Sequence, residues 1–304
     1  MLKISVVTTV LNAAPYVEQT VRSVIGQNDP NLEYIVLDAG STDGTFEKLD
    51  HFAQEISILE SSPDKGQYHA IQAGLSRSSG DIMAWINADD TYLPWAFSVV
   101  REIFANFPEV AWIIGLPAHV NRRGQMTRLA GQAGSYPRQY IQNGWFRPPL
   151  AGYLQQESIF WRRSLWDAAG GRLDLALEYA ADFELWTRFS SSADLVAVSV
   201  PLAAFRHRRG EQRSSLGIEE YEREVQQVCS QRARPPSLWN SISRANHATR
   251  WLYATLQWKR SPLIQYYRDE DRWILTNQLR PISQMSLPNL ICDYATQRAG
   301  KGAR

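Results

Sequence analysis

The first 120 residues alternate short apolar runs with amphipathic segments, and this alternation limits the fold more than any other feature of the chain. Ile4–Val10, Tyr34–Leu37 and Asp81–Ile86 are mostly apolar runs of the length expected for strands buried on both faces. The segments between them carry apolar residues at helical spacing, as Val17 and Val21 do. Strands that alternate with helices predict an α/β fold with a mostly parallel sheet flanked by helices.

Acidic residues directly follow two of these runs. Asp38 follows the second run, and Asn87-Ala88-Asp89-Asp90 follows the run that ends at Ile86. In a parallel sheet the carboxyl ends of the strands share one edge, where ligands bind. Carboxylates suit a nucleotide diphosphate only with a cation between them, and Mg²⁺ or Mn²⁺ matches oxygen ligands. The alternative is that Asp89 and Asp90 only turn the chain and cap the next helix.

A third polar segment, Pro63-Asp64-Lys65-Gly66-Gln67, precedes a predicted helix over 66–75. It offers a carboxylate, a cation and a glycine, and a helix N-terminus beside a lysine suits a phosphate group. An ordinary surface loop is the alternative interpretation.

Four segments in this order resemble the family 2 glycosyltransferases of the GT-A fold, which are inverting enzymes: residues 4–12, the Asp38 segment, residues 64–67 and residues 85–90. The resemblance covers about residues 1–210 and implies metal-assisted, in-line transfer of a sugar from a nucleotide diphosphate to an acceptor hydroxyl. Asn87-Ala88-Asp89 stands where that family has Asp-x-Asp, which implies Asp89 as the main metal ligand. The donor-binding residues so implied are Thr8, Val10, Asn12, Asp38, Asp64, Lys65, Gly66, Asn87, Ala88, Asp89 and Asp90.

The resemblance extends into the second half of the chain. Residues 178–186 are similar to the acidic helix start that holds the family's catalytic base, and Asp182 matches that base, with Glu178 as competitor. A carboxylate at a helix N-terminus is expected to stay ionised, and a simple capping role is the alternative. Residues 205–209 look like the late segment whose histidine completes the metal shell, so His207 is expected beside Asp89, unless its neighbouring arginines hold phosphates. The acceptor-binding residues implied are Gln156, Glu157 and Trp186.

Charge and composition limit the kinds of partner that this chain is expected to bind. The net charge of +1 gives no global field for nucleic acid, so no such partner is expected. No run approaches the roughly 18 apolar residues of a spanning helix, and the two cysteines fit a reducing compartment. We therefore expect a cytoplasmic protein, with the inner membrane face as a further possible contact through Trp251, Trp258 and Arg260. Eleven tryptophans, many after Trp145, suggest an aromatic cleft or interface.

We expect a GT-A domain over residues 1–215 and a C-terminal helical extension over 216–304. Within the domain, residues 1–120 would bind the nucleotide sugar and residues 121–215 the acceptor. Periodicity fails between residues 124 and 152, which predicts a long loop or flap over the site. In the extension, residues 219–231 and 238–258 are the expected helices.

Three other functions remain open at this point. A sugar-1-phosphate nucleotidyltransferase would share the layout, but it needs a glycine-rich first turn, where this chain has Asn12-Ala13-Ala14-Pro15. A non-catalytic nucleotide-sugar or glycan binding module has no need of Asp38, Asp89 and Asp182 together. A polyprenyl-phosphate sugar synthase would need membrane contact. The sequence leaves the donor (UDP-, GDP- or dTDP-sugar) open, and resemblance implies a glycan or lipid-linked sugar acceptor in cell-surface polysaccharide biosynthesis.

Overall fold

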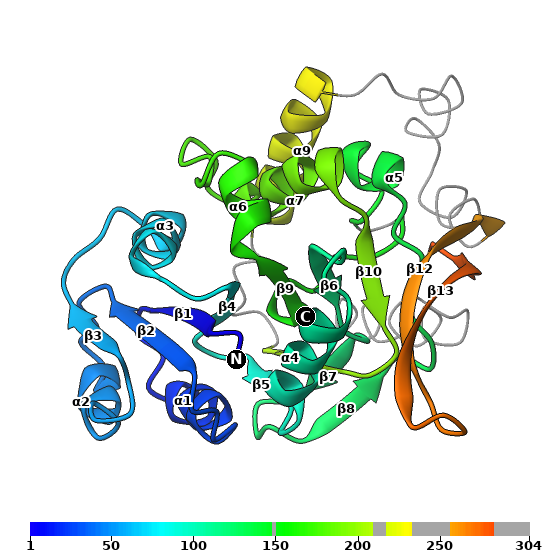
Figure 1. Cartoon of the computed structure of the whole chain (residues 1–304). Helices are drawn as coiled ribbons and strands as arrows, with labels where there is room; N and C mark the ends of the chain where they lie inside the picture. The colour runs from blue at the N-terminus through cyan, green and yellow to red at the C-terminus, as the bar shows by residue number, and fades with distance from the viewer. Residues whose placement is uncertain (148–149, 209–216, 233–255, 283–304) are drawn as a thin grey trace, which may run out of the picture.

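The computed structural model describes residues 1–147, 150–208, 217–232 and 256–282, and it is built around one large sheet (Figure 1). The strand order is β13-β12-β10-β6-β9-β4-β1-β2-β3. Neighbouring strands are parallel except where β9 joins β4 and β6 and in the β12–β13 hairpin. The strands are β1 (Ile4–Val10), β2 (Leu32–Asp38), β3 (Ile58–Ser61), β4 (Ile82–Asn87), β6 (Trp112–Ile114), β9 (Ile159–Arg162), β10 (Leu195–Val198), β12 (Trp258–Tyr267) and β13 (Arg272–Pro281).

Helices cover both faces of this sheet, which confirms the predicted α/β class. Figure 1 shows α1 and α2 on one side of β1 to β3 and α3 on the other. α1 buries Val17, Val21 and Val24, the apolar stripe that its sequence spacing predicts. The helices are α1 (Val17–Ile25), α2 (Thr45–Asp50), α3 (Gln67–Arg77), α4 (Ala96–Asn106), α5 (Arg138–Gln142), α6 (Arg163–Ala168), α7 (Ala181–Ser192) and α9 (Ile218–Arg232), with the short 3₁₀ helix η1 (Gln156–Ser158).

The strand register brings the predicted donor residues to one edge. Along β1, Val10 pairs with Asp38 of β2, and Thr9 pairs with Asn87 of β4. Both neighbours are parallel to β1, so the two polar strand ends lie on either side of its carboxyl end. The apolar β-branched run of β1 is buried on both faces, and this burial holds the edge in place.

A second, four-stranded sheet was not predicted. It has the order β5-β11-β7-β8, with β5 (Thr91–Tyr92), β11 (Ala203–Arg206), β7 (Ala118–Val120) and β8 (Met126–Leu129). Because β5 directly follows the turn at Asp90, its pairing with β11 brings the late arginine and histidine segment to that turn. The predicted loop over 124–152 is also partly wrong, since it contains β8 and α5.

The expected helical extension is only partly correct. α9 forms where a helix was predicted, but residues 258–281 form a hairpin whose first strand pairs in parallel with β10. Cross-strand pairing and burial of Leu263 and Ile264 decide this conformation, and they depend on distant residues. The predicted helix over 238–258 and Trp251 lie almost wholly outside the described residues. Among the described helices, none combines the length and apolar character that crossing a bilayer requires.

The large tryptophans form core rather than a cleft. Trp85 of β4 stacks on Trp186 of α7 with ring centroids 5.5 Å apart, and Trp112 and Trp161 pack against the same ring. All four side chains are buried. The expected aromatic cleft is therefore wrong for these residues, and the cluster instead fixes α7 against the strand that delivers Asp89.

Candidate active site

The turn after β4 is held by buried polar contacts. Asp90 is 1% exposed, and its Oδ1 accepts a hydrogen bond from the Arg206 backbone N–H (2.9 Å). Its backbone carbonyl accepts from Thr20 (2.8 Å), and its Oδ2 accepts from the Asn87 side-chain amide (3.1 Å). Asp90 thus anchors the turn, as the structural alternative anticipated, while the side chain of Asp89 stays 15% exposed.

Three carboxyl groups lie close enough at this turn to perturb each other. Burial raises the pKa of Asp89 against the opposing effect of Arg208, and burial with the charges of Asp89 and Glu157 raises the pKa of Asp90 far above its usual range. Burial also raises the pKa of Glu157 to about 8. Its buried Oε1 has no hydrogen-bond partner in the described part of the chain. Burial and mutual repulsion therefore make it costly to ionise all three carboxyls together.

Arg206, the last residue of β11, and Arg208, which follows it, both contact Asp89. Arg208 forms an ion pair with Asp89 Oδ2 (2.8 Å), and the Arg206 guanidinium donates to the Asp89 carbonyl (2.5 Å). Side chains alternate along an extended strand, so His207 points the other way. Its Nε2 lies 2.9 Å from Nδ1 of His119, and the two rings are stacked. His207 thus contacts His119 in this structure, and its place in a metal shell with Asp89 stays a prediction.

A metal at this turn would rest on Asp89. Within the described ranges, no group of three or more His, Cys, Asp or Glu side chains is placed to hold an ion alone. Asp89 is the partly exposed carboxylate of the acidic turn, and its hard oxygens suit Mn²⁺ or Mg²⁺. The residues present therefore fit a cation whose remaining ligands come from a bound diphosphate.

The Asp38 loop is organised by its own hydrogen bonds. Asp38 Oδ2 accepts from the Gly40 and Ser41 backbone N–H groups and from the Ser61 hydroxyl (2.6 Å). Asn12 joins this loop, because its Oδ1 accepts from the Thr42 N–H (3.0 Å). Any contact of Asp38 with the nucleotide base or the ribose would have to use carboxylate oxygens that already accept these hydrogen bonds.

The other predicted donor-binding residues differ in the groups that they can present to a bound donor. Thr8 is fully buried and its hydroxyl accepts from Tyr34, so a side-chain contact to a donor is wrong for Thr8. Val10 and Ala88 are buried and could contribute only backbone. Asp64 and Lys65 are exposed, and Asp64 Oδ1 accepts from the Gly66 N–H (2.7 Å) directly before α3.

Asp182 lies in the first turn of α7 and is partly exposed. Its Oδ1 accepts from the Phe183 N–H (2.7 Å) and from the Tyr68 hydroxyl (3.1 Å). Burial nevertheless raises the pKa of Asp182 to about 6. The helix N-terminus therefore does not hold this carboxyl at its usual pKa, yet the group is still mostly ionised at neutral pH.

The start of α3 connects the acidic turn with Asp182. The Gln67 amide donates to Asn87 Oδ1 (2.9 Å), and the next residue, Tyr68, donates to Asp182. Two adjacent residues thus touch two segments that are 95 positions apart in the chain (182 − 87). The structure brings the predicted donor and base sides together at this point.

The predicted acceptor-binding residues lie beneath the site. Trp186 is 1% exposed in the tryptophan cluster, and Glu157 is 2% exposed. Gln156 is also buried, and its amide donates to the Trp85 carbonyl of β4. Direct side-chain contact with an acceptor is therefore wrong for all three, because tertiary packing has placed them in the core.

Sequence reasoning missed the residues that surround Asp182. They are Tyr68 of α3, Tyr153, Tyr221 and Glu224. No short motif joins these positions, since α9 follows Asp182 by more than 30 residues. The available signal was the apolar side of α9, where Val225 and Val228 are buried.

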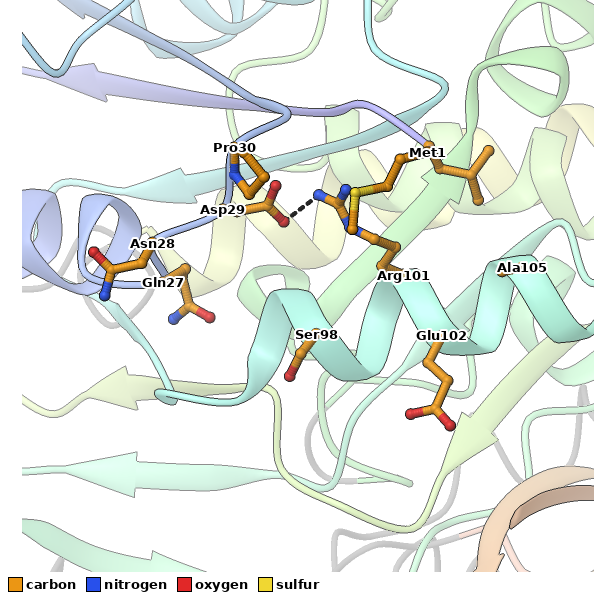
Figure 2. Close-up of a pocket in the computed structure, with 10 residues that line it drawn as sticks. Met1, Gln27, Asn28, Asp29, Pro30, Ser98, Arg101, Glu102 and Ala105 are labelled. Atoms are coloured by element: carbon orange, nitrogen blue, oxygen red, sulfur yellow. Dashed lines mark hydrogen bonds and ion pairs between the residues drawn. The ribbon is translucent and has the colours of Figure 1, made fainter.

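A hollow elsewhere on the molecule is separate from this site. Figure 2 shows it between Met1, the residues before β2 and α4, with an ion pair between Asp29 and Arg101. Met1 and Asp29 precede β1 and β2, so the hollow lies at the amino-terminal edge of these strands. It faces away from the edge that carries Asp38 and Asn87.

Comparison with known proteins identifies relatives of this chain. The model of the family described as Glycosyl transferase family 2 matches residues 5–168. A glycosyltransferase of Nostoc sp. is 24% identical over 177 residues, which is 52% of each chain, so this chain spans about half the length of that relative.

Two solved structures share the fold. Staphylococcus aureus TarS 1–349 in complex with UDP-GlcNAc has a TM-score of 0.59 at 15% identity, over 82% of this chain and 69% of that one. The mannosyltransferase PcManGT of Pyrobaculum calidifontis, in complex with GDP-Man and Mn²⁺, has a TM-score of 0.55 at 18% identity, over 82% and 70%. These likenesses show the GT-A fold.

Proposed function

This chain belongs to glycosyltransferase family 2, and on that premise we propose that it transfers a sugar from a nucleotide diphosphate to an acceptor hydroxyl with inversion. The observation that carries the proposal is the paired contact of Gln67 with Asn87 and of Tyr68 with Asp182. It joins the acidic turn to a carboxylate at a helix start, the two chemical groups that such a transfer needs.

Asp182 is the proposed base. It accepts the proton of the acceptor hydroxyl as the hydroxyl oxygen bonds to the anomeric carbon and the bond from that carbon to the diphosphate oxygen breaks. A base with a pKa of about 6 is ready at neutral pH and still binds a proton in the transition state. Because the transfer is a single displacement, it forms no covalent sugar intermediate, and the anomeric configuration inverts.

A divalent cation, Mn²⁺ or Mg²⁺, is the proposed cofactor, held by Asp89 with the donor diphosphate. Support comes from the acidic turn and from the Mn²⁺ in the structure of PcManGT. The cation would supply electrostatic stabilisation to the departing diphosphate. In this structure the positive charge beside the Asp89 carboxylate is the guanidinium of Arg208.

The proposed donor is a UDP-, GDP- or dTDP-sugar. TarS binds UDP-GlcNAc and PcManGT binds GDP-Man in their structures, which supports a nucleotide sugar without selecting the base. Residues 1–120 are the proposed donor half and residues 121–215 the acceptor half. A glycan or lipid-linked sugar acceptor, a role in polysaccharide biosynthesis and a cytoplasmic location with peripheral membrane contact remain predictions.

A binding and turnover screen tests the proposal. The purified protein is titrated calorimetrically with UDP-, GDP- and dTDP-sugars in Mn²⁺, Mg²⁺ or EDTA, and slow donor hydrolysis is followed by release of the nucleotide diphosphate. We expect one nucleotide class to bind only with metal and to be hydrolysed. Binding without any turnover would instead favour the non-catalytic module, and no binding to any donor would contradict the proposal.

A further inference from the structure

The carboxylate of Glu224 on α9 binds the segment that leads into α7. Its Oε1 accepts from the Glu178 backbone N–H (2.9 Å), and its Oε2 accepts from the N–H groups of Tyr179 and Ala180 (2.8 Å each). One side chain thus binds three consecutive backbone donors. These donors end two residues before Asp182, the proposed base.

Glu224 bonds the N–H groups that lead into α7: those of Glu178 and Tyr179 precede the helix, and that of Ala180 belongs to its N-cap residue. The residue at the start of α7 is Ala180, which has no side-chain oxygen to accept the free N–H groups of a helix start. A carboxylate is favoured there, because the positive end of the helix dipole and oriented N–H groups attract an anion. The cap comes from a helix that begins at residue 218, beyond the 5–168 range of the family match.

α9 is packed closely enough to hold Glu224 in place. Val225 and Val228 are buried against Ala181 and Phe183 of α7 in one apolar cluster. Gly217, just before α9, lies against the ring of Tyr179: a Cβ there would come within 2.1 Å of that ring. Figure 1 shows α9 beside the start of α7. Hydrophobic packing and charged hydrogen bonds therefore fix the same segment.

We propose that Glu224 is a positioning residue for Asp182: by capping residues 178–180 from α9, it sets where the base meets the acceptor. The inference rests on the proposed function, since Asp182 acts as a base only in that reaction. Displacing a base by about 1 Å can cost on the order of 100-fold in rate. α9 would thus be part of the working site rather than an appendage.

The same geometry gives the base a charged neighbour. The titratable groups that act on Asp182 are Tyr68 of α3, Tyr153 before η1, and Tyr221 and Glu224 of α9. Burial is the main cause of its raised pKa; the Tyr68 hydroxyl opposes that rise, and the negative charge of Glu224 adds to it. Removing that charge should move the acidic limb of the rate profile to lower pH.

The test compares Glu224→Gln with Glu219→Gln, an exposed glutamate on the same helix. For Glu224→Gln we expect kcat to fall about 10- to 100-fold with donor affinity within about twofold of wild type. The acidic limb of its pH–rate profile should shift to lower pH. The titration of the Asp182 carboxyl, followed by ¹³C NMR and assigned by comparison with Asp182→Asn, should shift in the same direction. Glu224→Asp keeps the charge but shortens the side chain, so it should lose rate without moving the limb; it also serves if Glu224→Gln does not fold.

The outcomes distinguish a failure of the positioning role of Glu224 from a failure of the proposed function. If Asp182→Asn abolishes transfer while Glu224→Gln matches Glu219→Gln in rate and pH profile, the positioning role is wrong and the proposed function stands. If Asp182→Asn transfers at the wild-type rate, the base assignment in the proposed function fails first. A lower kcat together with the shifted Asp182 titration supports the positioning role.

Discussion

The donor side and the base side of this site are built in different ways. On the donor side, the acidic turn follows β4 directly, and its position is set by strand register within the family-matched residues. On the base side, Asp182 depends on contacts from α3 and α9, which lie more than 100 residues before it and more than 30 after it. One side is a local motif on a strand end, and the other is assembled by tertiary packing.

This difference separates two kinds of perturbation. A change in the acidic turn should alter donor and metal binding, because Asp89 is its partly exposed carboxylate. A change around Asp182 should alter turnover and its pH dependence while leaving donor binding intact. Variants on each side can therefore show whether the two sides are functionally distinct.

Apart from loss of the base itself, the largest effect is expected from Asp89→Asn. Losing this charge removes the proposed metal ligand, so transfer should fall on the order of 10²- to 10³-fold and metal-dependent donor affinity should fall with it. Calorimetry in Mn²⁺ and a transfer assay measure the two quantities. Asp50→Asn, an exposed change on α2, is the control. If Asp89→Asn binds the donor as tightly as wild type, the acidic turn does not control donor binding, and the donor side and the base side are not functionally distinct.

Gly217→Ala tests the packing of the base side. The added Cβ would meet the Tyr179 ring at 2.1 Å, so the segment before α7 must shift. We expect kcat to fall about tenfold and stability to fall by about 1–3 kcal/mol, with donor affinity unchanged. Gly131→Ala is a matched control, because its Cβ meets no described atom within 4 Å. Equal melting temperatures and equal kcat in both variants would contradict the account.

Tyr68→Phe keeps the ring and removes the hydroxyl that donates to Asp182. That hydrogen bond lowers the pKa of Asp182 against the larger effect of burial, so its loss should raise the pKa above about 6. The base is active when ionised; the acidic limb of kcat/KM should therefore move to higher pH, by less than about one unit. Rates from pH 5 to 8 check this, with Tyr140→Phe, whose hydroxyl donates to Gln257, as control. A shift to lower pH would be inconsistent with this contact.

The smallest effect is expected from Glu157→Gln, and it concerns stability. Burial raises the pKa of Glu157 to about 8, from an unfolded value near 4.5, so folding favours the protonated acid. The stability this contributes is present at low pH and is lost as pH rises toward 8. Glu157→Gln lacks that loss, so its stability relative to wild type should rise steadily from pH 5 to pH 8. Urea unfolding in EDTA measures this, and a constant difference would contradict the raised pKa.

Sequence patterns were sufficient where local periodicity and strand ends decide the structure. The buried run of β1 and the acidic ends of β2 and β4 predicted the donor edge, because parallel strands place their carboxyl ends together. Patterns failed where distant pairing decides. The β12–β13 hairpin and the pairing of β11 beside Asp90 depend on partners far along the chain, and so does the burial of Trp186 and Glu157. The contacts of Arg206 and Arg208 with Asp89 were missed for the same reason, since they depend on the pairing of β11.

The most direct test is the transfer rate of Asp182→Asn, measured with donor binding followed on the same preparation. Asparagine keeps the shape of the side chain but cannot take the acceptor proton. We predict wild-type metal-dependent donor affinity and a transfer rate that is lower by on the order of 10²- to 10⁴-fold. Transfer at the wild-type rate would contradict it, because Asp182 would then not be the base.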